Sequence, residues 1–212
     1  MSPVQFWEVA PKLNNVMDVL VIDDFYDDPN NVRNIALSYD YTLTAPKHWK
    51  YNTEKVLWPG HITESLYKER NIDIKISKLL GKPYKSTVDS GFFRMNLKND
   101  STSYIAHTDG MPVQDKINYS GIIYLTPNIE NTVGTVFYKH KPTNKIKIEN
   151  LADANNISND YKKDVWEVDN IIEFKYNRLV LLNQALFHGY GTMFGSTKED
   201  CRLTQIFSFI QV

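Results

Sequence analysis

The stretch SYIAHTDG, residues 103–110, places a histidine and an aspartate two positions apart at the end of a β-rich segment. Alternate side chains of an extended strand share a face, so His107 and Asp109 can reach one ion while Thr108 points elsewhere. Residues 110–112, GMP, are typical of a turn. The pattern predicts a strand that delivers two ligands as it ends.

A second histidine follows another β-rich run far along the chain. Residues 178–182, RLVLL, favour a strand, and His188 stands shortly after them beside two glycines that free the backbone. Two imidazoles and one carboxylate are the ligand set that holds Fe(II) on one face and leaves the opposite positions open. Each residue also has an ordinary interpretation: His107 as a surface histidine, Asp109 as a turn cap and His188 as a hydrogen-bonded strand-end histidine.

An arginine opens the strand predicted over residues 202–210, RLTQIFSFI. By alternation, Arg202 and Thr204 lie on one face of this strand. A buried arginine needs a carboxylate partner, because removing one member of a buried ion pair costs roughly 3–5 kcal/mol. A dicarboxylic co-substrate would supply that partner.

Together these residues resemble the motif of the Fe(II)/2-oxoglutarate-dependent dioxygenases, which consists of His-x-Asp, a distal histidine and a basic residue shortly after it. The resemblance covers roughly residues 91–212. It implies that His107, Asp109 and His188 are the metal ligands, with no catalytic residue beyond them. It also implies that Arg202 binds the C5 carboxylate of 2-oxoglutarate.

Further stretches are similar to particular branches of that family. Residues 121–125, GIIYL, look like a strand of the prolyl-hydroxylase-like branch, which makes Tyr124 a second donor to the co-substrate carboxylate. Thr204 completes the Arg-x-Ser/Thr form seen in some members, and residues 134–138, GTVFY, resemble the following Gly-rich strand. Residues 21–26, VIDDFY, look like the opening of small bacterial and phage-type members.

The resemblance implies a cofactor set and a reaction. Fe(II), 2-oxoglutarate and O₂ would be used to hydroxylate an unidentified substrate, either a small molecule or a peptide or protein side chain. The carboxylate of Asp109 argues against halogenation, which normally needs that ligand absent. Two alternatives remain: a noncatalytic cupin-like binding module, and a metalloenzyme that does not use 2-oxoglutarate.

Composition limits the other classes of function. A chain of 212 residues with 42% hydrophobic content is expected to form one globular domain over residues 1–212. Its formal net charge of −1 gives no footprint for nucleic acid or an anionic membrane. No stretch approaches the roughly 20 apolar residues that span a bilayer, and the start lacks a signal-peptide pattern. A cytoplasmic location is therefore expected, and the oligomeric state stays open.

The pattern of elements predicts a mainly β protein with N-terminal helices. Over about residues 1–85 we expect a strand at 19–22, a helix starting at Asp28 and Pro29, and a second helix between residues 63 and 80. Over about residues 86–212 we expect a double-stranded β-helix of jelly-roll or cupin-like type. Its strands are predicted at 91–97, 104–107, 119–126, 134–138, 166–168, 178–182 and 201–210.

Two features lie outside this scheme. Residues 142–164, rich in Asn, Asp and Lys, are predicted to be an insertion between strands. Arg94, on the first strand of the predicted core, has two interpretations: a salt-bridged residue of the barrel wall, which is the commoner use, or a contact to substrate.

Overall fold

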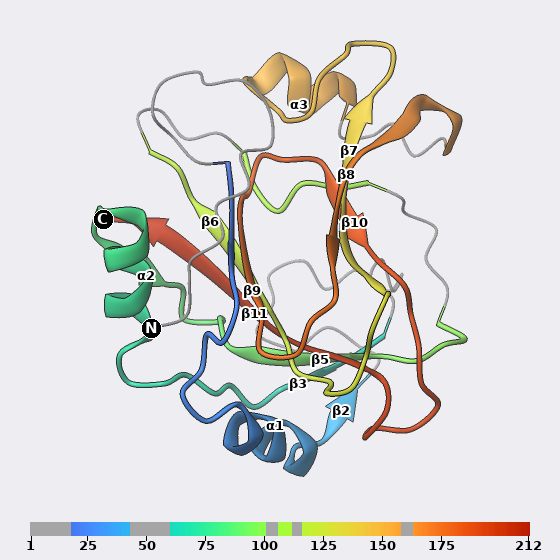
Figure 1. Ribbon diagram of the computed structural model, residues 1–212. Helices are drawn as coiled ribbons and strands as arrows, with labels where there is room; N and C mark the ends of the chain where they lie inside the picture. Colours follow the sequence, from blue (N-terminus) through green and yellow to red (C-terminus); the bar gives the residue numbers. More distant parts are fainter. Residues whose placement is uncertain (1–17, 43–59, 101–105, 112–115, 158–162) are drawn as a thin grey trace.

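Two antiparallel β-sheets form the centre of the molecule, and the helices α1, α2 and α3 lie around them (Figure 1). The computed structural model describes residues 18–42, 60–100, 106–111, 116–157 and 163–212. In the larger sheet the strand order is β1-β9-β6-β11-β5-β3-β2, and β4 also pairs with β11. These strands are β1 (Val19–Ile22), β2 (Tyr41–Thr42), β3 (His61–Thr63), β4 (Tyr84–Ser86), β5 (Phe92–Asn96), β6 (Tyr119–Tyr124), β9 (Leu179–Asn183) and β11 (Arg202–Gln211).

The smaller sheet has the order β10-β7-β8, with bounds β10 (His188–Tyr190), β7 (Val133–His140) and β8 (Trp166–Glu173). Its inner face packs against the larger sheet. A shared apolar cluster joins Phe137 and Ile172 of the smaller sheet to Val180 and Leu182 of the larger one. The prediction of a mainly β protein with a two-sheet core is confirmed.

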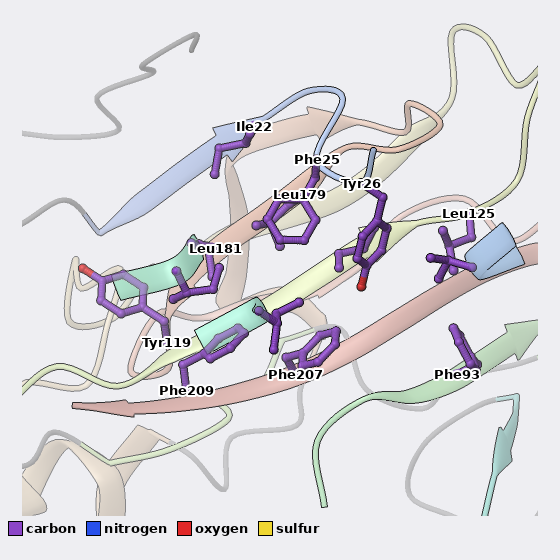
Figure 2. Packing of buried hydrophobic residues seen from close by; sticks show 14 of the residues in the cluster. Ile22, Phe25, Tyr26, Phe93, Tyr119, Leu125, Leu179, Leu181, Phe207 and Phe209 are labelled. Atoms are coloured by element: carbon purple, nitrogen blue, oxygen red, sulfur yellow. The ribbon is translucent and has the colours of Figure 1, made fainter. Parts of the chain in front are cut away.

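Strand β11 shows how the larger sheet divides its two faces. Phe207 and Phe209 lie on the outer face and stack with ring centroids 5.5 Å apart (Figure 2). Arg202 and Thr204 lie on the opposite, inner face and are also buried. Both faces of this strand are therefore buried, and the inner one carries polar side chains that need partners.

Helix α1 (Pro29–Ser38) covers part of the outer face. It begins as predicted, because the Asp28 carboxylate accepts a hydrogen bond from the backbone N–H of Asn31 at 3.0 Å and Pro29 occupies the first turn. Val32 and Ala36, four residues apart on one side of the helix, are buried in the same cluster as Phe207 and Phe209.

Helix α2 (Ile72–Leu80) lies in the predicted window and packs on the same cluster through Ile72 and Ile76. It ends at Gly81, whose φ of 68° is the left-handed conformation that favours glycine. Among the described residues, no helix is long and apolar enough to cross a membrane.

The predicted insertion contains a third helix. Helix α3 (Leu151–Ile157) buries Ala154 and Ile157 against Trp166 and Phe187, and the 3-10 helix η1 (Lys163–Val165) leads into β8. The insertion therefore adds its own small apolar cluster to the smaller sheet, which residue patterns alone did not indicate.

Other boundaries need correction. The strand predicted at 166–168 continues to Glu173, because it pairs with β7 along most of its length. The short strands β2, β3, β4 and β10 were not predicted, and three of them place residues before position 87 directly in the larger sheet. Of the strand predicted at 104–107, residues 104 and 105 lie outside the described residues, and His107 forms a single β-bridge.

An ion pair links the end of β1 to the start of β9. Asp23 accepts hydrogen bonds from Arg178 Nε at 2.6 Å and from Lys175 Nζ at 2.8 Å. Burial alone would raise the pKa of Asp23, but the hydrogen bonds from Arg178 and Lys175 outweigh it and lower the pKa. The pKa of Asp23 in the folded state lies below the unfolded value near 3.8. The stabilisation that the ion pair gives to the folded state is therefore present above pH 3.8, and it is lost as the pH falls through the folded-state pKa.

We expect Asp23→Asn to reduce the free energy of unfolding at neutral pH by about 1.5–3 kcal/mol, since it removes hydrogen bonds to a charged group. Urea unfolding at neutral and at acid pH measures this, and the difference from wild type should shrink at acid pH. Asp27→Asn is the matched control: the Asp27 side chain is 93% exposed, so its 3.7 Å pair with Lys75 should contribute less than about 1 kcal/mol. Equal effects of the two substitutions would contradict the assignment.

Candidate metal centre

Two histidines from distant parts of the sequence are held together by backbone hydrogen bonds. His107 and His188 form an antiparallel β-bridge in which each backbone N–H donates to the carbonyl of the other at 2.9 Å. Their imidazole rings lie with centroids 4.3 Å apart. The predicted meeting of the His-x-Asp segment with the distal histidine therefore occurs through main-chain pairing.

Asp109 joins this pair from the turn that follows His107. Its backbone N–H donates to the carbonyl of Gln184 at 3.0 Å, which fixes the turn against the residues before β10. The carboxylate then lies 3.4 Å from Nε2 of His107 and, through its other oxygen, 3.4 Å from Nε2 of His188. The potential ligand atoms of the three residues all lie within 4.8 Å of one another, the arrangement that a metal ion requires.

The orientation of His188 is set by a backbone carbonyl. His188 is buried, and its Nδ1 lies 3.0 Å from the carbonyl oxygen of Leu186, to which it donates when protonated. That hydrogen bond leaves Nε2 directed at Asp109. A ligating histidine in proteins is usually held in this way through its other ring nitrogen.

The electrostatics of the cluster favour a cation. Burial alone would raise the pKa of Asp109, but His188 and His107 hold it well below its usual range, so the group is a carboxylate. Burial, with the neighbouring His188, lowers the pKa of His107 to about 4, so this imidazole is neutral at neutral pH. Burial also opposes the charged form of His188, but the Asp109 carboxylate outweighs it and raises the pKa.

Arg202, the predicted co-substrate anchor, is 3% exposed on the inner face of β11. Its Nη2 donates to the carbonyl of Gly134 at 2.7 Å, and its guanidinium lies 5.7 Å from the ring centre of Tyr124. Its Nε is buried and makes no hydrogen bond within the part of the chain that the structure describes. A buried charged donor of this kind suits an anionic acceptor, because leaving it unpaired is costly.

Tyr124 and Thr204, the other predicted contacts to the co-substrate, are cross-strand neighbours on β6 and β11. Both are fully buried, and the hydroxyl of Tyr124 lies 2.6 Å from that of Thr135 on β7. Gly134 is required here, since a Cβ at that position would lie 2.5 Å from the Tyr124 hydroxyl. The structure thus gathers Arg202, Tyr124 and Thr204 on one inner wall.

Sequence reasoning missed Tyr190. It lies two residues after His188 on β10, so both side chains share a face, and its ring centre is 6.1 Å from that of His107. The alternation after His188 was the signal that could have identified it. Its hydroxyl accepts a hydrogen bond from Arg94 Nη1, so Arg94 belongs to the same interior.

Comparison with known proteins places the fold. No family model matches the sequence, and no curated protein matches it. Among solved structures, HygX from Streptomyces hygroscopicus with nickel, 2-oxoglutarate and hygromycin B bound is similar, with a TM-score of 0.51, 12% identity, and coverage of 92% of this chain and 83% of that chain. SnoK, a non-heme alpha-ketoglutarate-dependent carbocyclase from nogalamycin biosynthesis, has a TM-score of 0.56 and 12% identity over 92% of this chain and 79% of that chain.

A third similar structure is SnoN, a non-heme alpha-ketoglutarate-dependent epimerase from the same biosynthesis, with a TM-score of 0.54, 10% identity, and coverage of 92% of this chain and 76% of that chain. The chain therefore has the fold of the Fe(II)/2-oxoglutarate-dependent oxygenases. The predicted double-stranded β-helix is confirmed.

We expect His188→Ala to abolish stoichiometric binding of one Fe(II), measured anaerobically by titration and metal analysis, because two ligands do not replace three in a buried site. His107→Ala and Asp109→Ala should behave in the same way. His61→Gln is the control, since His61 lies on β3 and is not part of the three-residue cluster. Fe(II) binding by His188→Ala as tight as by wild type would refute the ligand assignment.

Proposed function

We propose that this chain is an Fe(II)- and 2-oxoglutarate-dependent oxygenase that hydroxylates an organic substrate. The observation that carries the proposal is the presence in one fold of the His107, Asp109 and His188 cluster, in which His188 is buried, together with the buried Arg202. The cluster has the chemistry of a redox-active divalent metal site, and the arginine has the chemistry of a carboxylate site. The similarity of fold supports the combination.

In this proposal the two imidazoles and the Asp109 carboxylate hold Fe(II). The carbonyl of Leu186 keeps the proton of His188 on Nδ1, so Nε2 is the ligand atom. When bound, Fe(II) and 2-oxoglutarate supply the oxidising chemistry: O₂ is consumed, 2-oxoglutarate becomes succinate and CO₂, and one oxygen atom enters a C–H bond of the substrate. Asp109 would supply a carboxylate ligand, which halogenation normally needs absent, so the residues favour hydroxylation.

Arg202 would bind the distal carboxylate of 2-oxoglutarate. Its hydrogen bond to Gly134 and its contact with the Tyr124 ring fix the guanidinium before a ligand arrives, so little side-chain entropy is lost on binding. Nε remains as the donor to the carboxylate. The hydroxyl groups of Tyr124 and Thr204, on the same wall, would add neutral hydrogen bonds.

The substrate of the proposed reaction is a small molecule or a peptide or protein side chain. HygX, which shares the fold, has been solved with hygromycin B bound. The two walls around the cluster would also exclude water from the reacting groups, since both sheets contribute buried apolar residues behind it.

We expect Arg202→Lys to weaken 2-oxoglutarate binding about 10- to 100-fold, because lysine cannot place a charge-assisted donor where the fixed guanidinium has its Nε, a contact worth roughly 1.5–3 kcal/mol. Tyr124→Phe should weaken it only about fivefold, since it removes a neutral hydrogen bond worth about 1 kcal/mol. Calorimetry on Zn(II)-loaded protein measures both, and both variants should keep the metal. An unchanged dissociation constant in Arg202→Lys would move the anchor to another residue.

Iron-loaded wild-type protein should convert 2-oxoglutarate slowly to succinate without its substrate, because the ligands and the anchor would already position all the reactants. Succinate is measured by mass spectrometry against metal-free wild type and against His188→Ala, and both should form none above background. Iron binding without any affinity for 2-oxoglutarate would refute the proposal and favour a metalloenzyme independent of this co-substrate.

A further inference from the structure

A second buried arginine faces the same interior as Arg202. Arg94, on β5, is 8% exposed and is paired in register with Thr204 of β11 and with Ile62 of β3. Arg202 pairs with Asn96, so the two arginines lie on adjacent antiparallel strands, two positions apart on the same face. The proposed function uses only one of them.

The contacts of Arg94 hold its position and leave one edge unused. Nη1 donates to the hydroxyl of Tyr190, and the guanidinium lies 5.7 Å from the ring centre of Tyr190 and 5.9 Å from that of Phe92. The other edge carries Nε and Nη2. Nε is buried and makes no hydrogen bond within the described ranges, and no carboxylate there forms an ion pair with Arg94. The described residues therefore do not show Arg94 as the salt-bridged residue of the barrel wall that the sequence suggested.

Arg94 lies beside the proposed metal ligands. Its hydrogen-bond partner Tyr190 is two residues from His188, and the Tyr190 ring centre is 6.1 Å from that of His107. Burial and His188 are the largest causes that lower the pKa of His107, and the positive charge of Arg94 adds to them. An anion held by Arg94 would thus be close to the metal centre.

The positive charges around the proposed metal centre exceed the negative charges of Asp109 and 2-oxoglutarate by one. Two guanidinium groups and a divalent cation carry four positive charges, and Asp109 carries one negative charge. The two carboxylates of 2-oxoglutarate bring two more negative charges, which leaves one positive charge uncompensated. A buried charge without a partner costs several kcal/mol, so the assembled site would favour a third anionic group.

We propose that Arg94, through Nε and Nη2 and with Tyr190 positioning it, binds a carboxylate of the substrate and holds the neighbouring C–H bond near the metal. This assignment rests on the proposed function and adds a substrate class to it: compounds with a free carboxylate. A planar carboxylate matches the parallel donors of that arginine edge. Arg202 keeps the distal carboxylate of 2-oxoglutarate.

The arginine Nε–H signals in ¹⁵N NMR spectra test the two assignments separately. Zn(II)-loaded full-length protein, which does not turn over, is titrated first with 2-oxoglutarate and then with acetate, and acetamide serves as the neutral control. Arg94→Lys and Arg202→Lys assign the two buried signals. We expect 2-oxoglutarate to shift the Arg202 signal, and acetate, but not acetamide, to shift the Arg94 signal saturably.

Affinities of the variants complete the test. Arg94→Gln should weaken acetate binding at least tenfold and change the dissociation constant of 2-oxoglutarate by less than twofold. Arg70→Gln, which removes the same charge from an exposed position, should change neither. Retained Zn(II) binding shows that the variants are folded.

Three results would overturn the assignment. In the first, a saturating concentration of acetate leaves the Arg94 signal unmoved. In the second, acetate and acetamide shift that signal equally. In the third, Arg94→Gln weakens the binding of 2-oxoglutarate as much as the binding of acetate. The last result would make Arg94 part of the co-substrate site and leave the proposed function intact. Absence of any response to 2-oxoglutarate at Arg202 would instead refute the proposed function, and this assignment with it.

Discussion

The β-bridge between His107 and His188 is the interaction on which the candidate site depends. The paired backbones bring the two imidazole rings to 4.3 Å between centroids, and the hydrogen bonds from the Asp109 and Gly110 N–H groups to the Gln184 carbonyl extend the contact by one turn. These are main-chain bonds, so the fold itself sets the ligand spacing. The Asp109 carboxylate lies 3.4 Å from both imidazoles, and a bound cation would match its negative charge.

The two faces of the larger sheet have separate roles. The outer face packs apolar side chains against α1 and α2, so its contribution is stability, and large-to-small changes there should act through cavity formation. The inner face carries Arg94, Arg202, Thr204 and Tyr124, all buried. Because β11 contributes to both faces, one strand positions the core and the proposed anchor Arg202 together.

The long, periodic elements could be predicted from the sequence, and the short ones could not. The ten-residue β-rich run of β11 and the Asp28-Pro29 start of α1 are local signals. Strands β3, β4 and β10 have three residues each, too few for a period, and they exist only because a neighbouring strand offers hydrogen bonds. The same limit applies to the site: the His-x-Asp spacing is local, whereas the hydrogen bond from Arg94 to Tyr190 joins residues that no spacing relates.

The orientation of Arg94 shows what the structure adds to such a sequence. In the stretch FFRMN every second residue shares a face, but both faces of β5 are buried, so alternation alone does not say which side meets the metal centre. The register with Thr204 decides it, because Thr204 and Arg202 lie on the same face of β11. Two arginines then share one low-dielectric interior, where like charges repel strongly unless anions separate them. In the proposed site, a co-substrate with two carboxylates would balance one guanidinium and part of the metal charge, and the remaining guanidinium would make the site selective for a negatively charged substrate.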